Sequence, residues 1–190
     1  MKSKPGTIRS TGIRNYIRMH FLSKPLYETK IYNGLVLDIS CGWGIYFKIN
    51  PYATGIDLDD ACINFLQKQG YKAVKGDILK KFPFNDEQFK CAIAHDVLEH
   101  FELAEAEIIM NEAYRILQKQ GLFLVIIPNK RGFEYGLKRE VGHKHYIVPK
   151  EVIKLAESKF LLRKCYSYPF SGLLGKLFIH NKEVVALEKL

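Results

Sequence analysis

An alternation of short apolar runs with amphipathic helix patterns is the feature that most restricts the fold of this chain. Runs typical of buried strands occupy residues 35–39, 52–57, 71–74, 89–94, 122–127, 162–168 and 183–187. Helical spacing of apolar residues separates them at about 59–69, 103–117 and 149–159. Strands that alternate with helices form a mostly parallel sheet covered by helices on both faces. The sequence therefore predicts a Rossmann-like, doubly wound α/β fold.

The length and composition fit a single domain. The 190 residues lie within the usual range of one domain, and 47% hydrophobic residues exclude a largely disordered chain. We divide the domain into a basic N-terminal arm with an amphipathic helix at 1–30, a central half at 33–129 and a last region at 130–190. That last region is expected to hold a long basic loop at 130–148, a helix and the C-terminal strands.

Nothing in the sequence predicts insertion into a membrane. The longest run of large apolar residues, 122–127, is far shorter than the ~20 residues of a spanning helix. The first 30 residues lack the apolar core and cleavage site of a secretory signal. The four cysteines form no CxxC pair, which fits free thiols in a reducing compartment. We therefore expect a cytoplasmic protein.

The net charge of +9 is distributed unevenly along the chain. Residues 1–30 carry seven Lys or Arg against one acid, and residues 130–145 carry five against two. The stretch 31–129 has thirteen acids and nine bases. Basic flanks around an acidic middle suit an anionic partner or substrate, and the simpler interpretation is a solvated lysine-rich surface.

Polar and glycine-rich residues follow the expected strands at the edge where such sheets bind ligands. The turn from Ser40 to Gly44 consists mainly of small residues that let the backbone approach a ligand closely. Phe47 stands where a dinucleotide-binding loop needs its third glycine, and no GxxxxGK[ST] phosphate loop occurs. Asp57 after the second strand suits ribose hydroxyls, and Asp77 after the third suits an adenine amino group. The pattern favours a nucleoside that is not held by phosphate.

Six motifs in order resemble those of a known enzyme family. They are Val36–Gly44, Gly55–Asp57, Gly76–Ile78, Asp96–His100, Ile116–Leu122 and Ile127–Asn129. Together they resemble class I S-adenosylmethionine-dependent methyltransferases, of the methyltransferase type 11 group that includes quinone-biosynthesis enzymes. The resemblance spans roughly residues 33–165. It implies a seven-stranded sheet with an antiparallel last strand, and S-adenosylmethionine as the cofactor, which becomes S-adenosylhomocysteine. Residues 33–129 are then the cofactor-binding half and 130–190 the substrate side.

The resemblance also implies which residues hold the methionine part of the cofactor. Asp38 would anchor the glycine loop near the methionine amino group. Ser40, Gly42 and Gly44 would line the methionine part. His95 would lie beside it, largely through its backbone.

Residues after the second and third strands would bind the nucleoside part of the cofactor. By resemblance, Asp57 would bind the ribose hydroxyls and Leu58 would pack on the adenine. Asp77 would bind the adenine amino group, with Ile78 on the ring face.

Two departures from the family pattern stand out. Ser40 replaces the first glycine of the loop, and the stretch before the second strand is about one turn short. We therefore expect a stunted first helix.

No residue is assigned a catalytic role from the sequence, and His95, His143 and His145 are the candidates. The sulfonium group already makes the methyl group electrophilic, so the protein has mainly to align the reactants and exclude water. A general base is needed only where the acceptor must lose a proton. No metal site is expected, because the polar run 95–100 fits a strand end opening into a helix and the later histidines lack an evident third ligand.

The sequence thus predicts an S-adenosylmethionine-dependent methyltransferase for a small or medium-sized acceptor, and the basic flanks raise the option of an anionic one. One alternative is an RNA methyltransferase that uses those flanks. Against it, residues 95–98 lack the Asn/Asp-Pro-Pro-aromatic motif of enzymes that methylate amino groups of nucleic acids. A second alternative is a family member without catalytic activity that binds the cofactor or a partner protein. Trp43 either stacks on the acceptor or packs under the first helix.

Overall fold

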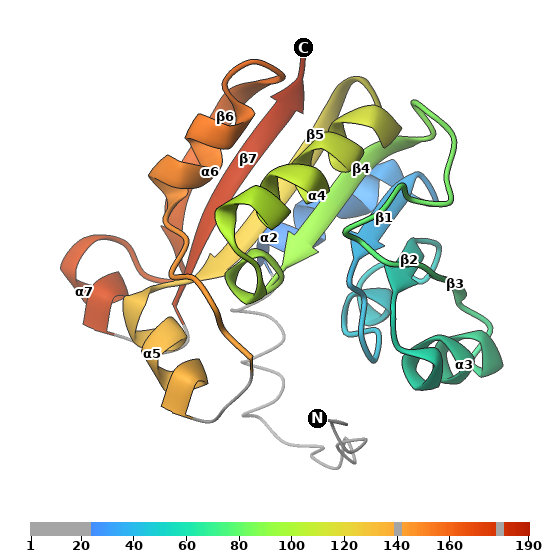
Figure 1. Ribbon diagram of the computed structural model, residues 1–190, viewed down its shortest axis with the longest axis horizontal. Helices are drawn as coiled ribbons and strands as arrows, with labels where there is room; N and C mark the ends of the chain where they lie inside the picture. Colours follow the sequence, from blue (N-terminus) through green and yellow to red (C-terminus); the bar gives the residue numbers. More distant parts are fainter. Residues whose placement is uncertain (1–23, 139–141, 178–180) are drawn as a thin grey trace.

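The computed structural model describes residues 24–138, 142–177 and 181–190. Seven strands form one sheet in the order β3-β2-β1-β4-β5-β7-β6 (Figure 1). Their bounds are β1 Val36–Ile39, β2 Thr54–Asp57, β3 Lys72–Lys75, β4 Phe89–His95, β5 Leu117–Pro128, β6 Phe160–Tyr168 and β7 Lys182–Lys189. Strands β1 to β5 pair in parallel, and β7 runs antiparallel to both of its neighbours. The predicted Rossmann-like sheet with an antiparallel last strand is confirmed.

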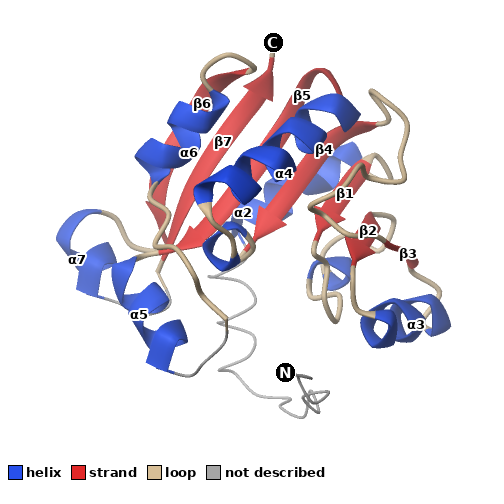
Figure 2. Cartoon of the chain, in the orientation of Figure 1, coloured by secondary structure: helices blue, strands red, loops and turns tan. Residues whose placement is uncertain are grey.

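Helices lie on both faces of this sheet (Figure 2). The longer ones are α3 Asp60–Lys68, α4 Leu103–Ile116, α5 Lys130–Lys138 and α6 Pro149–Ala156. Shorter turns are α2 Lys24–Tyr27, η1 Glu28–Tyr32, η2 Tyr46–Lys48, η3 Leu98–His100 and α7 Gly172–Leu177. None of the described helices is long and apolar enough to cross a membrane. The expected N-terminal helix lies outside the described residues.

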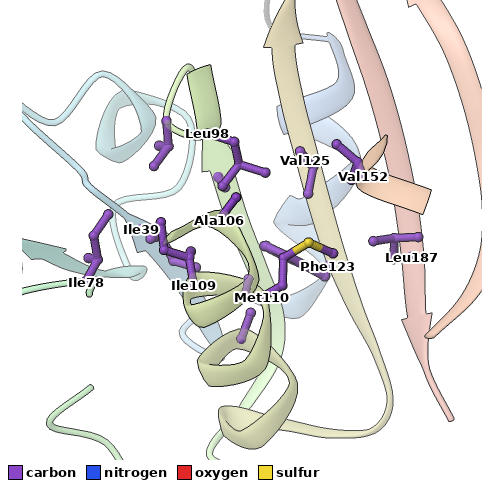
Figure 3. Packing of buried hydrophobic residues seen from close by; sticks show 14 of the residues in the cluster. Ile39, Ile78, Leu98, Ala106, Ile109, Met110, Phe123, Val125, Val152 and Leu187 are labelled. Atoms are coloured by element: carbon purple, nitrogen blue, oxygen red, sulfur yellow. The ribbon is translucent and has the colours of Figure 1, made fainter. Parts of the chain in front are cut away.

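Two hydrophobic clusters occupy the two faces of the sheet, because successive residues of a strand point in opposite directions. Leu37 and Ile39 of β1 belong to the cluster under α4 and α6, shown in part in Figure 3. Val36 belongs to the other cluster, which also contains Leu26 of α2 and Ile63 of α3. Each fully buried aliphatic side chain contributes about 1.5–3 kcal/mol of transfer free energy. This packing fixes the carboxyl ends of β1 to β4 along one edge.

The connection between β1 and β2 is short, as predicted. It contains only η2, a three-residue 3₁₀ helix, in place of a full first helix. Trp43 in this connection is half-buried, and its ring meets the edge of Phe65 from α3 at a centroid distance of 5.5 Å. The tryptophan therefore packs on the helix after β2.

The prediction of a long basic loop at 130–148 was wrong in its first half. Residues 130–138 form helix α5, which lies beyond the carboxyl ends of β4 and β5 (Figure 1). The Asn129 side chain accepts a hydrogen bond from the Gly132 N–H at 2.8 Å, and such side chains satisfy the free donors of a first helical turn. Phe133 is buried beneath the helix. Residues 142–148 do form a loop, and the short helix α7 was not predicted.

Candidate functional site

The glycine-rich loop after β1 is a tight left-handed turn. Ser40, Gly42 and Gly44 have φ angles of +57°, +49° and +79°. Glycine adopts such angles freely, whereas another residue pays a cost of roughly 1–2 kcal/mol. Ser40 adopts the positive φ angle although it carries a side chain, so the loop forms without its first glycine. A Cβ atom on Gly42 would meet nothing within 4 Å, so open space lies beside the backbone there.

Asp57 ties this loop to the end of β2. One carboxylate oxygen accepts the Gly42 N–H at 2.8 Å, and the other accepts the Asp59 N–H at 3.0 Å. A carboxylate offers about four lone-pair sites, so two hydrogen bonds leave acceptor capacity for the hydroxyls of a ligand. Leu58, the next residue, is 62% exposed. An apolar side chain in that position offers a face to an aromatic ring.

Asp38 is a buried carboxyl group without a compensating partner. It is 6% exposed, and no hydrogen bond among the described residues involves its side chain. Burial raises the pKa of Asp38 to about 8, and the negative charge of Asp57 adds to the shift. A cation bound next to this carboxyl group would lower its pKa and remove part of the cost of burying it.

The end of β3 meets the end of β2 through a close turn. The Gly76 N–H donates to the Asp57 carbonyl at 2.9 Å, and a Cβ on Gly76 would lie 2.6 Å from Ile56. Asp77 accepts the Leu79 N–H at 3.0 Å with one oxygen. Its other oxygen lies 3.6 Å from the Lys80 ammonium. Asp57 and Asp77 therefore lie at the carboxyl ends of two adjacent strands, β2 and β3.

Ile78 follows Asp77 as a core residue. It is 7% exposed and belongs to the cluster under α4. Little of its surface is open to a ligand, so its predicted place on an adenine ring rests on the resemblance alone.

A charged group missed by the sequence analysis occupies the end of β4. Lys182, the first residue of β7, donates to both oxygens of Asp96 at 2.5 and 2.7 Å. Burial opposes ionisation of Asp96, but the positive charge of His95 when it is protonated and the Lys182 ammonium outweigh burial and hold the pKa of Asp96 below its usual range. Burial lowers the pKa of His95, assisted by Lys182 and opposed by Asp96. His95 is therefore neutral at pH 7 and able to accept a proton.

The structure gives the three candidate histidines different partners. His143 Nδ1 lies 3.0 Å from the Phe133 carbonyl, and its ring stacks on Phe133. His145 Nε2 lies 3.3 Å from both carboxylate oxygens of Glu151 in α6. Within the described residues, no ion pair or hydrogen bond joins either of them to His95.

A comparison with protein families gives a match for the part of the chain that carries the glycine loop and the carboxylates Asp57 and Asp77. A family model described as a methyltransferase domain matches residues 37–125, from β1 into β5. The predicted resemblance to class I S-adenosylmethionine-dependent methyltransferases is thereby confirmed.

Two relatives match about half of this chain. An uncharacterised protein of Methanocaldococcus jannaschii is 35% identical over 98 residues, which are 50% of this chain and 41% of that protein. A human protein named probable tRNA methyltransferase 9B is 30% identical over 96 residues, 49% of this chain and 21% of that one. This chain thus spans less than half the length of these relatives.

A solved structure supports the fold over nearly the whole chain. An S-adenosylmethionine-dependent methyltransferase from Archaeoglobus fulgidus superposes with a TM-score of 0.70 at 15% identity. The match covers 94% of this chain and all of that one. At this identity the comparison supports the shared fold and no more. The roles of individual site residues in this chain remain predictions.

Proposed function

We propose that this protein transfers the methyl group of S-adenosylmethionine to a small or medium-sized acceptor. The observation that carries the proposal is the joined arrangement of Asp38, the glycine loop and Asp57 at adjacent strand ends. The residues present fit the cofactor. Asp38 is a buried carboxyl group without a partner among the described residues, and it adjoins an open backbone loop and a carboxylate, Asp57, with spare acceptor capacity. When bound, the cofactor supplies a methyl group on an electrophilic sulfonium.

Each of these residues has a separate task in the proposal. Asp38 attracts the amino group of the methionine part, because an ammonium is the kind of partner that its buried carboxyl group lacks. Asp57 accepts the two ribose hydroxyls while its hydrogen bond to Gly42 holds the loop closed. Leu58 covers the adenine ring, and Asp77 accepts from the adenine amino group. These contacts orient the cofactor relative to the acceptor.

His95 is the side chain best placed to receive a proton from an acceptor. It ends β4 beside the loop strand, is half-buried, and is neutral at pH 7 because burial lowers its pKa. An acceptor that ionises on methylation would need such a group, whereas an acceptor with a free lone pair would not.

Calorimetric titration of S-adenosylmethionine and S-adenosylhomocysteine tests the proposal. We expect binding in the micromolar range by the wild-type protein and at least tenfold weaker binding by Asp57→Asn (~1.4 kcal/mol). Asp60→Asn is the matched control, because this neighbouring carboxylate is exposed and pairs with Lys75. Absence of binding by folded wild-type protein, or equal loss in both variants, would contradict the proposal.

RNA is the second candidate acceptor, supported by the likeness to a probable tRNA methyltransferase and by exposed bases on α5. Lys130, Arg131 and Lys138 are all exposed there. Binding through phosphates would make log K fall linearly with log salt concentration. A steep slope for tRNA, reduced by Lys130→Ala and Lys138→Ala, would favour RNA. A small-molecule acceptor would leave the methyltransferase without such a dependence.

A further inference from the structure

A second buried carboxyl group lies just beyond β4, in the short helix η3. Glu99 is 1% exposed, and neither of its carboxylate oxygens has a hydrogen-bond partner among the described residues. A buried carboxylate with no partner is expensive, and proteins relieve the cost with a proton, a cationic side chain or a metal ion. The proposed methyl transfer gives this residue no task.

Two histidines converge on this carboxyl group. One ring nitrogen each of His100 and His143, and one oxygen of Glu99, all lie within 4.8 Å of one another. The two imidazole rings stand edge to face with centroids 5.0 Å apart. His100 belongs to η3, whereas His143 comes from the loop after α5, so the tertiary fold builds the cluster.

The hydrogen bonds of the two rings prepare them for a metal ion. His100 Nδ1 lies 3.1 Å from the Gly142 carbonyl, and His143 Nδ1 lies 3.0 Å from the Phe133 carbonyl. A carbonyl oxygen only accepts, so Nδ1 carries the hydrogen in both rings and Nε2 keeps its lone pair. Metal-binding histidines are oriented in this way, through a hydrogen bond from the second ring nitrogen.

The backbone around the cluster holds the loop onto η3. The N–H groups of Lys144 and His145 both donate to the Glu99 carbonyl, at 2.8 and 3.3 Å. A Cβ atom on Gly136 would lie 2.1 Å from the His143 ring, so glycine in α5 makes room for that side chain. The three groups therefore have fixed positions rather than a chance encounter at the surface.

We propose that Glu99, His100 and His143 bind a divalent transition-metal ion. Two imidazoles and one carboxylate form a donor set that zinc and similar ions accept, and three protein ligands leave a coordination position for water or an acceptor oxygen. The sequence analysis expected no metal site because it found no third ligand for His143. The fold supplies that ligand from η3.

Metal titration tests this site independently of methyl transfer. Chelator-treated protein is titrated with ZnCl₂ and with CoCl₂, in a Cys165→Ser background that removes the exposed thiol. We expect one ion per chain at micromolar or lower concentration, with visible Co²⁺ bands of nitrogen and oxygen ligation. Glu99→Gln and His143→Gln should each weaken binding at least tenfold. His145→Gln is the control, because this histidine of the same loop pairs with Glu151 instead.

Each outcome of the metal titration either supports the metal site or overturns it. No stoichiometric binding of Zn²⁺ or Co²⁺ by folded protein would overturn the metal site, as would binding that His143→Gln leaves unchanged. Because His143 is half-buried, that variant decides the matter if Glu99→Gln does not fold. Failure here leaves the cofactor titration of Asp57→Asn unaffected, so the two proposals fail separately.

Discussion

Replacing Asp38 with asparagine is expected to stabilise the cofactor-free protein and to weaken its binding of S-adenosylmethionine at least tenfold. The gain arises because burial raises the pKa of Asp38 from 3.8 to about 8, so the folded protein must hold a proton or a poorly solvated charge. An uncharged amide of the same shape avoids that cost. The loss of binding arises because the amide offers no negative charge to the amino group of the cofactor.

The stability effect depends on pH in a defined direction. Between pH 4 and pH 8 the folded protein retains the Asp38 proton, whereas the unfolded chain has lost it. The contribution of Asp38 to the free energy of unfolding of the wild type is therefore fully present below pH 4 and is lost as the pH rises toward 8. The advantage of Asp38→Asn should grow over that window to roughly 6 kcal/mol and then level off.

Urea unfolding of wild type and variant at pH 5, 7 and 8.5 measures this advantage. Calorimetry in buffers of different ionisation enthalpy adds a second readout, because cofactor binding at pH 7 should release the Asp38 proton from the wild type only. Asp60→Asn, an exposed carboxylate, is expected to show neither effect. A difference in stability that is constant with pH would refute the assignment of the cost to Asp38.

The sheet and its ligand-binding edge were predictable from the sequence because their signals are local. Each buried strand is a short apolar run, and each strand end carries its own polar or glycine residue next to it in the chain. Asp57 illustrates this: it directly ends β2, and its role in closing the loop follows from the parallel register of β1 and β2. The two residues joined by that bond lie on neighbouring strand ends in any sheet of this order.

Helix α5 was missed because its composition resembles a loop. Two glycines and four charged residues stand within 130–138, and only Phe133 and Gly136 are buried. The capping side chain, Asn129, was instead interpreted as the end of a strand motif. The helix is stabilised by its contact with the sheet edge more than by its own helix propensity.

Contacts between distant segments lie beyond what the sequence indicates. Lys182 and Asp96 pair across 86 positions because β7 inserts beside β5. His143 likewise meets Glu99 only after α5 and its loop fold back onto η3. The motif Asp96–His100 marks one partner of each pair, but no local pattern indicates that Lys182 or His143 is the other.

Substituting alanine for Gly44 is expected to cost about 2–5 kcal/mol of folding free energy and to abolish cofactor binding. The φ angle of +79° disfavours any side chain by roughly 1–2 kcal/mol. The new Cβ would also lie 2.3 Å from Leu66 and 3.0 Å from Phe47, where forced packing costs about 1–3 kcal/mol. Leu66 is 1% exposed and belongs to a hydrophobic cluster, so the new Cβ would have to displace a side chain packed among other buried residues.

Two other glycines separate backbone strain from the packing clash. Gly70 and Gly42 also have positive φ angles, but a Cβ at either would meet nothing within 4 Å. Gly70→Ala, at the end of α3, should therefore cost only the strain of roughly 1–2 kcal/mol and leave cofactor binding intact. Gly42→Ala should show the same modest loss of stability together with weaker binding, because its side chain enters the loop. Urea unfolding and calorimetry of the three variants measure both quantities. Equal losses of stability in all three would mean that contact with Leu66 does not determine the shape of the loop, because strain alone would then account for the cost.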